Sequence, residues 1–301
     1  MSATQETTEK LSSLSVLAPK ESVEFFLKDL LGLTSTALKK FSLSKKLLNK
    51  SAERGFVLHL PLNLLNRGHI HPEYDGPPMK IIFEDDFILA IDKASCVHTH
   101  PLSYCEKNNC LSFLRATRDD RLLNVNLANY DRGLLYRLDF ETSGVLIYIK
   151  DEALHENLRA NFLTLIKEKV YHCLVKGKFD KDGAHEHFFY SSGERGHKVV
   201  CSAHLSSSKK DGQKGALKVR SLNYDSSKNE SLLEVILYTG LRHQIRAQLA
   251  ALGFPLLGDT LYGGKPYERL CLHARSYTIE SKGLRYQIES SSFPFVTLAI
   301  L

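Results

Sequence analysis

The sequence predicts an α+β protein built on a mixed sheet. Runs rich in Val, Ile, Leu and Tyr, typical of strands, alternate irregularly with helical stretches at residues 151–166 and 242–253. Long polar segments such as residues 206–216 join some of these runs. This order is typical of a mixed sheet and not of a regular parallel one. The expected strands lie at residues 81–93, 144–150, 168–179 and 231–240.

Length and charge set broad bounds on function. A chain of 301 residues suffices for one large domain, with or without a small appendage, and 43% hydrophobic residues provide a core. The formal net charge of +6 is a mild basic bias. It permits an acidic partner such as nucleic acid without requiring one.

Cysteine usage and the N-terminus predict a cytoplasmic location. Six cysteines are scattered without a CxxC pair, and the first 13 residues are polar where a secretory signal needs an apolar core. We therefore expect free thiols in a reducing compartment. The apolar runs are far shorter than the roughly 20 residues of a membrane span, so we expect no membrane association.

Gly, Pro, Asn and Asp gather at residues 66–79, and such clusters are typical of linkers. The sequence thus predicts a small segment at residues 1–75 and a large domain at residues 76–301.

The small segment is basic. Residues 27–55 hold seven Lys or Arg against two acidic residues, a local excess of +5. This excess indicates either a solvated helix face or a small RNA-docking module, with Lys39 and Lys40 as candidate RNA contacts.

The stretch YRLDFETSG, residues 136–144, places Asp139 in a turn directly before an apolar strand. A carboxylate in such a turn is fixed by the sheet yet reachable, which suits a catalytic group. Alternatively, Asp139 or Thr142 organises the turn through hydrogen bonds to the backbone.

In the helix at residues 242–253, Ile245 and Leu249 belong to an apolar stripe, and Arg242 and Arg246 share the adjacent side. An arginine beside a buried face needs an anion. The alternative is a solvated or structurally paired arginine.

The strand at residues 168–179 carries Tyr171. Its ring is either part of the core or a platform on which a nucleobase stacks.

Histidine pairs at 98 and 100 and at 185 and 187 lack the Cys or carboxylate neighbours of a metal site, so we predict structural roles and no metal. Neither GxxxxGK[ST] nor a strand followed by GxGxxG is present.

Together these segments resemble the RluA-type family of RNA pseudouridine synthases. The resemblance covers about 200 residues, and RLDxxTSG and HQIRxxL are its most specific parts. The matching stretches are IIFEDDFILAIDK, VHTHP, YRLDFETSGVLIYIK, EKVYHCLVKG, TGLRHQIRAQLAALGFPLLGDTLYGG and LCLHARSY.

The resemblance implies that Asp139 is the nucleophile, that Arg246 pairs with it, and that Tyr171 is the active-site aromatic. It implies a largely antiparallel sheet flanked by helices, no cofactor, a monomer, and RNA as partner. The expected RNA is that of the large ribosomal subunit, with transfer RNA as the alternative. The basic segment faintly resembles an S4-type RNA-binding domain.

The chain departs from the family pattern at three places. Tyr136 stands where His usually precedes RLD, Leu241-Arg242 replaces Arg-Thr or Arg-Lys, and Ala94 replaces Pro after Lys93. None of these removes a residue implied to be catalytic, but RNA contacts near Arg242 are expected to differ.

The implied reaction detaches uracil through nitrogen and reattaches it through carbon 5. An Arg246 pair would keep Asp139 ionised in a water-poor pocket. A uridine in a stem must leave the stack to reach Asp139. Arg137 is the candidate to fill the vacated space or to hold a phosphate.

Two other classes of function remain open. One is a non-catalytic RNA-binding or ribosome-assembly protein on the same fold. The other is a glycoside hydrolase using Glu84, Asp85 and Asp86, although such an enzyme needs two carboxyls across a cleft and this run is more typical of a turn.

Overall fold

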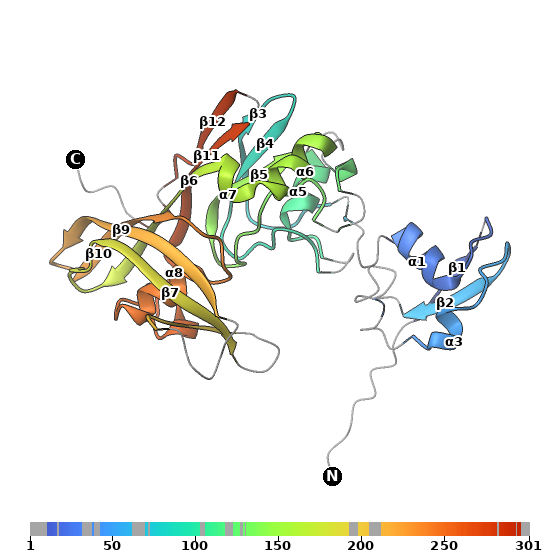
Figure 1. Cartoon of the computed structure of the whole chain (residues 1–301), viewed down its shortest axis with the longest axis horizontal. Helices are drawn as coiled ribbons and strands as arrows, with labels where there is room; N and C mark the ends of the chain where they lie inside the picture. The colour runs from blue at the N-terminus through green and yellow to red at the C-terminus, as the bar shows by residue number, and fades with distance from the viewer. Residues whose placement is uncertain are drawn as a thin grey trace, which may run out of the picture. The chain divides into compact units, whose positions relative to one another are not determined.

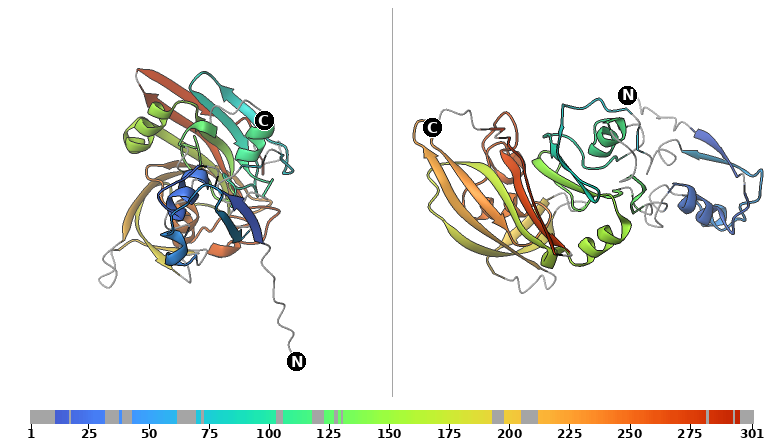
Figure 2. Two further views of the ribbon diagram at one scale, coloured as in Figure 1. Left: turned by 90° about the vertical axis from the view of Figure 1, so that its right-hand side faces the viewer. Right: turned by 90° about the horizontal axis from the view of Figure 1, so that it is seen from above.

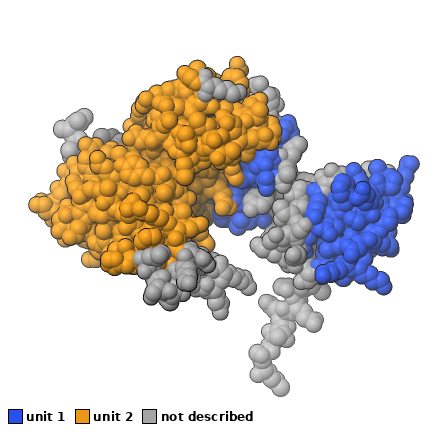
Figure 3. All heavy atoms as spheres, in the orientation of Figure 1, with its two compact units in different colours: residues 1–77, 98–133 blue, residues 78–97, 134–301 orange. Residues whose placement is uncertain are grey.

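The computed structural model divides into two compact units, shown in different colours in Figure 3. One comprises Met1–Pro77 with His98–Gly133, and the other Pro78–Val97 with Leu134–Leu301. The structure describes residues 11–16, 18–31, 38, 43–61, 70–71, 73–102, 106–117, 123–126, 129, 131–192, 198–204, 212–281, 283–292 and 294–295.

The larger unit is built on a ten-stranded sheet in the order β3-β4-β5-β11-β6-β10-β9-β7-β8, with β12 paired to β11. Among the described strands, β5 and β11 run parallel and the other neighbours are antiparallel. The predicted mixed, largely antiparallel sheet is therefore confirmed. The strands are β3 (Lys80–Glu84), β4 (Ile88–Lys93), β5 (Ser143–Ile149), β6 (Ile166–Lys176), β7 (Gly183–Ser192), β8 (Lys198–Ser202), β9 (Gln213–Asp225), β10 (Glu230–Leu237), β11 (Leu272–Ser281) and β12 (Leu284–Glu289).

Helices accompany the sheet at both ends of this unit. In Figures 1 and 2, α6 (Glu152–Ala160) and α7 (Phe162–Leu165) lie near β5 and β6, and α8 (Gln244–Ala251) lies with strands β7 to β10. The short 3₁₀ helix η3 (Thr260–Tyr262) follows α8 and contacts it. The helix expected at residues 151–166 is two helices, because it is interrupted at Asn161 and runs directly into β6.

The run expected as one strand at residues 81–93 is a hairpin of β3 and β4. Asp85 closes its turn, because the carboxylate Oδ1 accepts hydrogen bonds from the backbone amides of Phe87 (2.8 Å) and Ile88 (2.7 Å). Glu84 pairs with Lys150 at 2.7 Å. Two of the three carboxylates considered for glycoside hydrolysis therefore have structural partners at this turn.

Burial along the strands follows their sequences. All seven residues of β5 are buried, as expected for an apolar strand covered on both faces, whereas β10 alternates buried and half-buried residues. Strand β6 pairs with β10 on one side and β11 on the other. It therefore joins the two halves of the sheet.

The parallel contact between β5 and β11 requires glycine at position 144. Gly144 has φ +110°, and a Cβ there would lie 2.2 Å from the carbonyl oxygen of Ala274. The close approach aligns Ser143 with His273, whose Nδ1 lies 2.8 Å from the Ser143 Oγ. The turn that carries Asp139 is thereby fixed at the start of β5.

In the smaller unit, β1 (Leu11–Ser15) and β2 (Val57–Pro61) form an antiparallel pair. A compact apolar cluster accompanies them, with Val23 and Leu27 of helix α1 (Val23–Leu31) and Leu58 and Leu60 of β2 among its members. The unit also contains α3 (Lys45–Leu48) and α5 (Cys110–Thr117). Lys39, Lys40 and part of the predicted linker (residues 66–69 and 72) lie outside the described residues. The S4-like assignment and the 75/76 boundary stay predictions.

None of the helices within the described ranges is both long and apolar enough to cross a membrane. The five cysteines described, Cys96, Cys110, Cys173, Cys201 and Cys271, are free thiols.

We predict that Gly144→Ala lowers the free energy of unfolding by about 3 kcal/mol or more, because it adds steric overlap with fixed backbone to an unfavourable φ. Gly253→Ala is the matched control. Gly253 also has a positive φ, +88°, but no atom lies within 4 Å of the added Cβ, so we expect a loss of about 1 kcal/mol. Chemical denaturation of both variants measures the difference, and equal losses would contradict the close contact.

Candidate active site

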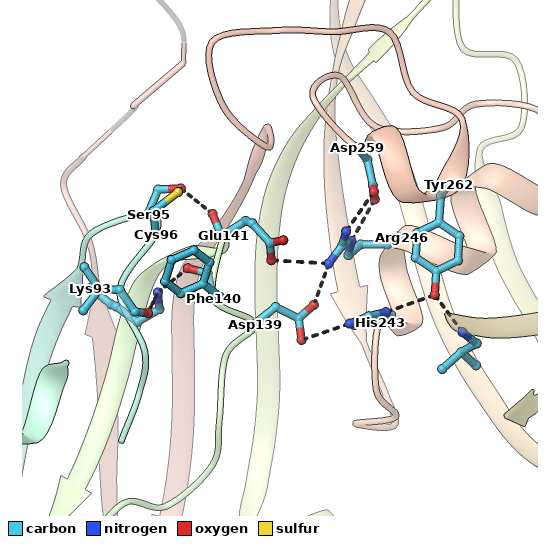
Figure 4. A network of polar contacts seen from close by, with 12 residues as sticks. Lys93, Ser95, Cys96, Asp139, Phe140, Glu141, His243, Arg246, Asp259 and Tyr262 are labelled. Carbon is cyan, nitrogen blue, oxygen red and sulfur yellow. Dashed lines mark hydrogen bonds and ion pairs between the residues drawn. The ribbon is translucent and has the colours of Figure 1, made fainter. Parts of the chain in front are cut away.

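Asp139 lies in an anchored turn immediately before β5. The backbone amide of Thr142 donates to the Asp139 carbonyl at 3.1 Å, and the side chain of Asp139 remains 27% exposed. Two side chains hold this turn, one from the last residue of β4 and one from the segment after it. Lys93 Nζ donates to the Phe140 carbonyl (3.0 Å) and Ser95 Oγ to the Glu141 carbonyl (2.6 Å), as Figure 4 shows. The carboxylate is thus fixed at its backbone and reachable at its tip.

Lys93 is a fully buried cation whose ammonium donates to three carbonyl oxygens. Besides Phe140, these belong to Ala94 (2.9 Å) and Val97 (2.7 Å). Since an ammonium group has three protons, the set satisfies it completely. The segment after β4 and the Asp139 turn are therefore held as one piece.

Arg246 enters the site from α8 with its side chain 5% exposed. Its guanidinium forms a bidentate pair with Asp259, in which Nε and Nη2 donate to the two carboxylate oxygens at 2.8 Å each. The remaining Nη1 lies 3.5 Å from Asp139 Oδ2 and 3.6 Å from Glu141 Oε2 (Figure 4). The structure thus brings Arg246 to Asp139, as predicted, but its closest anion is Asp259.

Electrostatics keep Arg246 charged. Burial lowers its pKa, but the hydrogen bonds and charge of Asp259, with smaller contributions from Asp139 and Glu141, outweigh burial and raise the pKa above its ordinary value. A permanent positive charge therefore faces Asp139.

His243 lies on the other side of Asp139, with Nε2 3.9 Å from Oδ1. Its Nδ1 lies 3.1 Å from the hydroxyl of Tyr262, which in turn accepts the backbone amide of Val199 at 3.1 Å. Burial lowers the pKa of His243; Asp139 opposes this effect, and Arg246 adds to it. The ring is therefore neutral at pH 7.

Tyr171 lies on β6, where it pairs with Ala274 of β11, and it is 6% exposed. Its hydroxyl is hydrogen-bonded to that of Tyr277. Burial raises the pKa of Tyr171, and the charge of Asp139 raises it further, so the phenol keeps its proton at neutral pH. Tyr171 thus lies within electrostatic reach of Asp139, and its stacking role stays a prediction.

Tyr136, which replaces the family's usual His, belongs to an aromatic stack behind Tyr171. Its ring lies 4.3 Å from that of Tyr277 with an angle of 8° between the planes. Its hydroxyl donates to the Val145 carbonyl at 2.9 Å. The departure at position 136 is therefore accommodated by packing.

The two candidate RNA contacts that the structure describes, Arg137 and Arg242, are exposed. Arg137 is two residues before Asp139, and Arg242 immediately precedes His243. The other two candidates, Lys39 and Lys40, lie outside the described residues.

The histidine pairs have local partners. His98 Nδ1 is bonded to Glu106, His185 Nε2 to the Lys181 carbonyl at 2.7 Å, and His187 Nδ1 to Gln248 Nε2 at 3.1 Å. Among the described residues, no three His, Cys, Asp or Glu side chains come together as metal ligands.

Sequence reasoning missed four residues of this cluster: Glu141, His243, Asp259 and Tyr262. Each lies in a matching stretch, in RLDFETSG, HQIR or GDTLYGG. Their chemistry depends on contacts between α8, η3 and the β5 turn, which the spacing of one segment does not reveal.

We predict that Asp259→Asn lowers the free energy of unfolding by about 3–5 kcal/mol, because it leaves a buried guanidinium without its charged partner. Glu141→Gln removes a carboxylate near the same guanidinium. The Glu141 side chain is 43% exposed and its contact of 3.6 Å is longer than that of Asp259, so we expect the free energy of unfolding to change by less than about 0.5 kcal/mol. Urea unfolding distinguishes the two, and an equally mild effect at 259 would contradict the importance of the bidentate pair.

Comparison with known sequences identifies the same region. The family model described as RNA pseudouridylate synthase matches residues 88–251, which include Asp139, Tyr171 and Arg246. The ribosomal large subunit pseudouridine synthase D of Borreliella burgdorferi is 30% identical over 67% of this chain and 61% of its own length. An uncharacterized RNA pseudouridine synthase of Mycobacterium bovis is 31% identical over 70% of this chain and 68% of its own. The chain thus spans about three fifths of the Borreliella relative.

Solved structures share the fold. The human RNA pseudouridylate synthase domain containing 1 aligns with a TM-score of 0.58 at 20% identity, over 73% of this chain and 85% of its own. The human RNA pseudouridylate synthase domain containing 4 aligns with a TM-score of 0.52 at 18% identity, over 70% of this chain and 87% of its own. With the family match extending from β4 through α8, this chain belongs to the RNA pseudouridylate synthase family.

Proposed function

We propose that the protein isomerises specific uridines to pseudouridine in structured RNA, with Asp139 as the nucleophile. The observation that carries the proposal is a partly exposed carboxylate, on an anchored turn, that faces a buried and permanently charged arginine. Membership of the family supports it.

The chemistry suits these residues. The uracil leaves the ribose through nitrogen and returns through carbon 5, with no net gain or loss of atoms or electrons, so the reaction needs no redox cofactor or energy input. A carboxylate nucleophile divides the exchange into two steps through a covalent intermediate. The Arg246 guanidinium lies 3.5 Å from the Asp139 carboxylate that makes the attack and so places a positive charge beside it.

We infer that the RNA is that of the large ribosomal subunit, because relatives such as the Borreliella protein are named for it. Transfer RNA is the alternative substrate. A paired uridine must leave its stack to reach Asp139, at a cost of a few kcal/mol. We also propose that the protein acts in the cytoplasm, as the scattered cysteines indicate, and that it is a monomer, as the resemblance to the family implies.

Three further residues have proposed roles in binding. Tyr171 supports the uracil ring from β6, and its neutral phenol suits a stacking partner better than a base. Arg137 and Arg242 are exposed and lie close in sequence to Asp139 and His243, and we assign them to binding of RNA phosphates. Arg137 alternatively fills the space that the extruded uridine leaves.

We predict that Asp139→Asn keeps the wild-type fold but abolishes activity, since an amide is a far weaker nucleophile than a carboxylate. The measurement is tritium release from 5-tritiated total RNA of a strain lacking this protein, with circular dichroism to check folding.

Asp180→Asn is the matched control, because it makes the same change at a side chain that is 68% exposed in the connection between β6 and β7. It should release tritium like the wild type. Release by Asp139→Asn would refute the nucleophile. No release by the wild type would instead favour a non-catalytic RNA-binding or ribosome-assembly protein.

We predict that Arg137→Ala weakens RNA binding. The plot of the logarithm of the association constant against the logarithm of salt concentration should become less steep by about 0.7–0.9, the effect of one lost phosphate contact. Lys181→Ala, at a side chain that is 50% exposed in the same connection as Asp180, controls for loss of a positive charge. Filter binding over a salt series measures both slopes. An unchanged slope for Arg137→Ala would remove its phosphate role.

A further inference from the structure

His243 is held in an uncommon conformation at the start of α8. Its φ of 52° lies in the left-handed region, which only a few per cent of non-glycine residues adopt, His, Asn and Asp more often than the others. Its carbonyl accepts the amide of Ala247 at 2.9 Å, which begins the helix. Strained backbone of this kind persists where the surroundings impose it, and it clusters at functional sites.

The hydrogen-bond chain behind His243 sets the position of its proton. The Tyr262 hydroxyl accepts the Val199 amide and, since burial raises its pKa, it keeps its own proton to donate to His243 Nδ1. When Nδ1 accepts, the proton of a neutral imidazole is on Nε2. The Asp139 carboxylate favours the same tautomer, because an unprotonated Nε2 would face an anionic oxygen.

We propose that His243 is a positioning residue for Asp139, donating its Nε2 proton to Oδ1 while Arg246 Nη1 faces Oδ2. This inference rests on the function proposed above. The present 3.9 Å between Nε2 and Oδ1 is about 1 Å longer than an N–H···O hydrogen bond, and such contacts tighten when substrate binds. Figure 4 shows the carboxylate between the imidazole and the guanidinium.

A neutral donor on this side has a chemical advantage. Arg246 is shared with Asp259 and Glu141, so it holds Asp139 only in part. A hydrogen bond from neutral His243 orients the carboxylate without adding a second full positive charge, which would reduce its nucleophilicity. Protonated His243 would form an ion pair with Asp139 instead.

The groups around the ring define this balance. Asp139 and Glu141 face it from the turn, Arg242 and Arg246 from the start of α8, and Tyr262 from η3. Lys198 lies over the Tyr262 ring at 5.3 Å. The pKa of His243 is lowered below the ordinary 6.5 of histidine. The neutral ring therefore predominates at neutral pH and is lost as pH falls through the lowered pKa.

Two substitutions at position 243 distinguish the roles of the two ring nitrogens. His243→Asn tolerates positive φ and places its amide near the position of Nδ1, so it retains the Tyr262 side and lacks the Nε2 donor. His243→Gln reaches the position of Nε2. We expect the single-turnover rate of tritium release, with enzyme in excess over 5-tritiated total RNA, to fall about 10- to 100-fold in His243→Asn and distinctly less in His243→Gln. The enzyme concentration giving half the maximal rate should stay within about twofold.

The pH profile tests positioning against a merely structural role. In the wild type, the rate should fall on the acid side of the profile as His243 gains a proton and its neutral form is lost. His243→Gln has no titrating imidazole, so the part of the acid-side fall that His243 causes should be absent. Tyr262→Phe, which keeps the ring and removes the hydroxyl, should lower the rate while folding normally, and it provides the test if His243→Asn does not fold.

Three results would overturn the inference: wild-type rate and pH profile in His243→Asn, equal losses in the Asn and Gln variants, or a wild-type rate in Tyr262→Phe. Release by the wild type and loss in Asp139→Asn show separately that the proposed function holds. Absence of release by the wild type would refute that function and this inference with it.

Discussion

The buried ion pair between Arg246 and Asp259 is the interaction on which the rest of the site depends. Asp259 is fully buried, and each of its carboxylate oxygens accepts a hydrogen bond from the Arg246 guanidinium, so the orientation of Arg246 is set before any substrate is present. A buried pair of this kind contributes little net stability compared with apolar packing, but it fixes geometry. In this protein, that geometry aims the third guanidinium nitrogen at Asp139.

The site is assembled from segments that are far apart in the sequence. The tight β5–β11 contact at Gly144 places the Asp139 turn, and Lys93 and Ser95 hold it from the end of β4 and the segment that follows. Residues 243–262 supply the opposite side through α8 and η3. Preorganisation by backbone contacts leaves the functional side chains free to serve chemistry.

Periodicity in the sequence predicted the α+β class and the mixed sheet, whereas the proximity of Arg246 to Asp139 was implied by the resemblance to the family. The sequence did not predict that Asp259 is the main partner of Arg246, because a contact between α8 and a later loop depends on tertiary folding. The split of the expected helix at Asn161 and the left-handed backbone of His243 are likewise imposed by neighbouring elements. Residue types indicated which groups were present, and packing determined how they pair.

The stack of Tyr136 on Tyr277 couples two positions that are far apart in the sequence. The two rings fill one buried space, 4.3 Å apart and nearly parallel, although 141 residues separate them in the sequence. A smaller side chain at either position would leave a cavity against the other, so the effects of substitutions at the two positions are not independent. The two rings act as one packing unit, so the effect of a substitution at position 136 depends on the residue at 277.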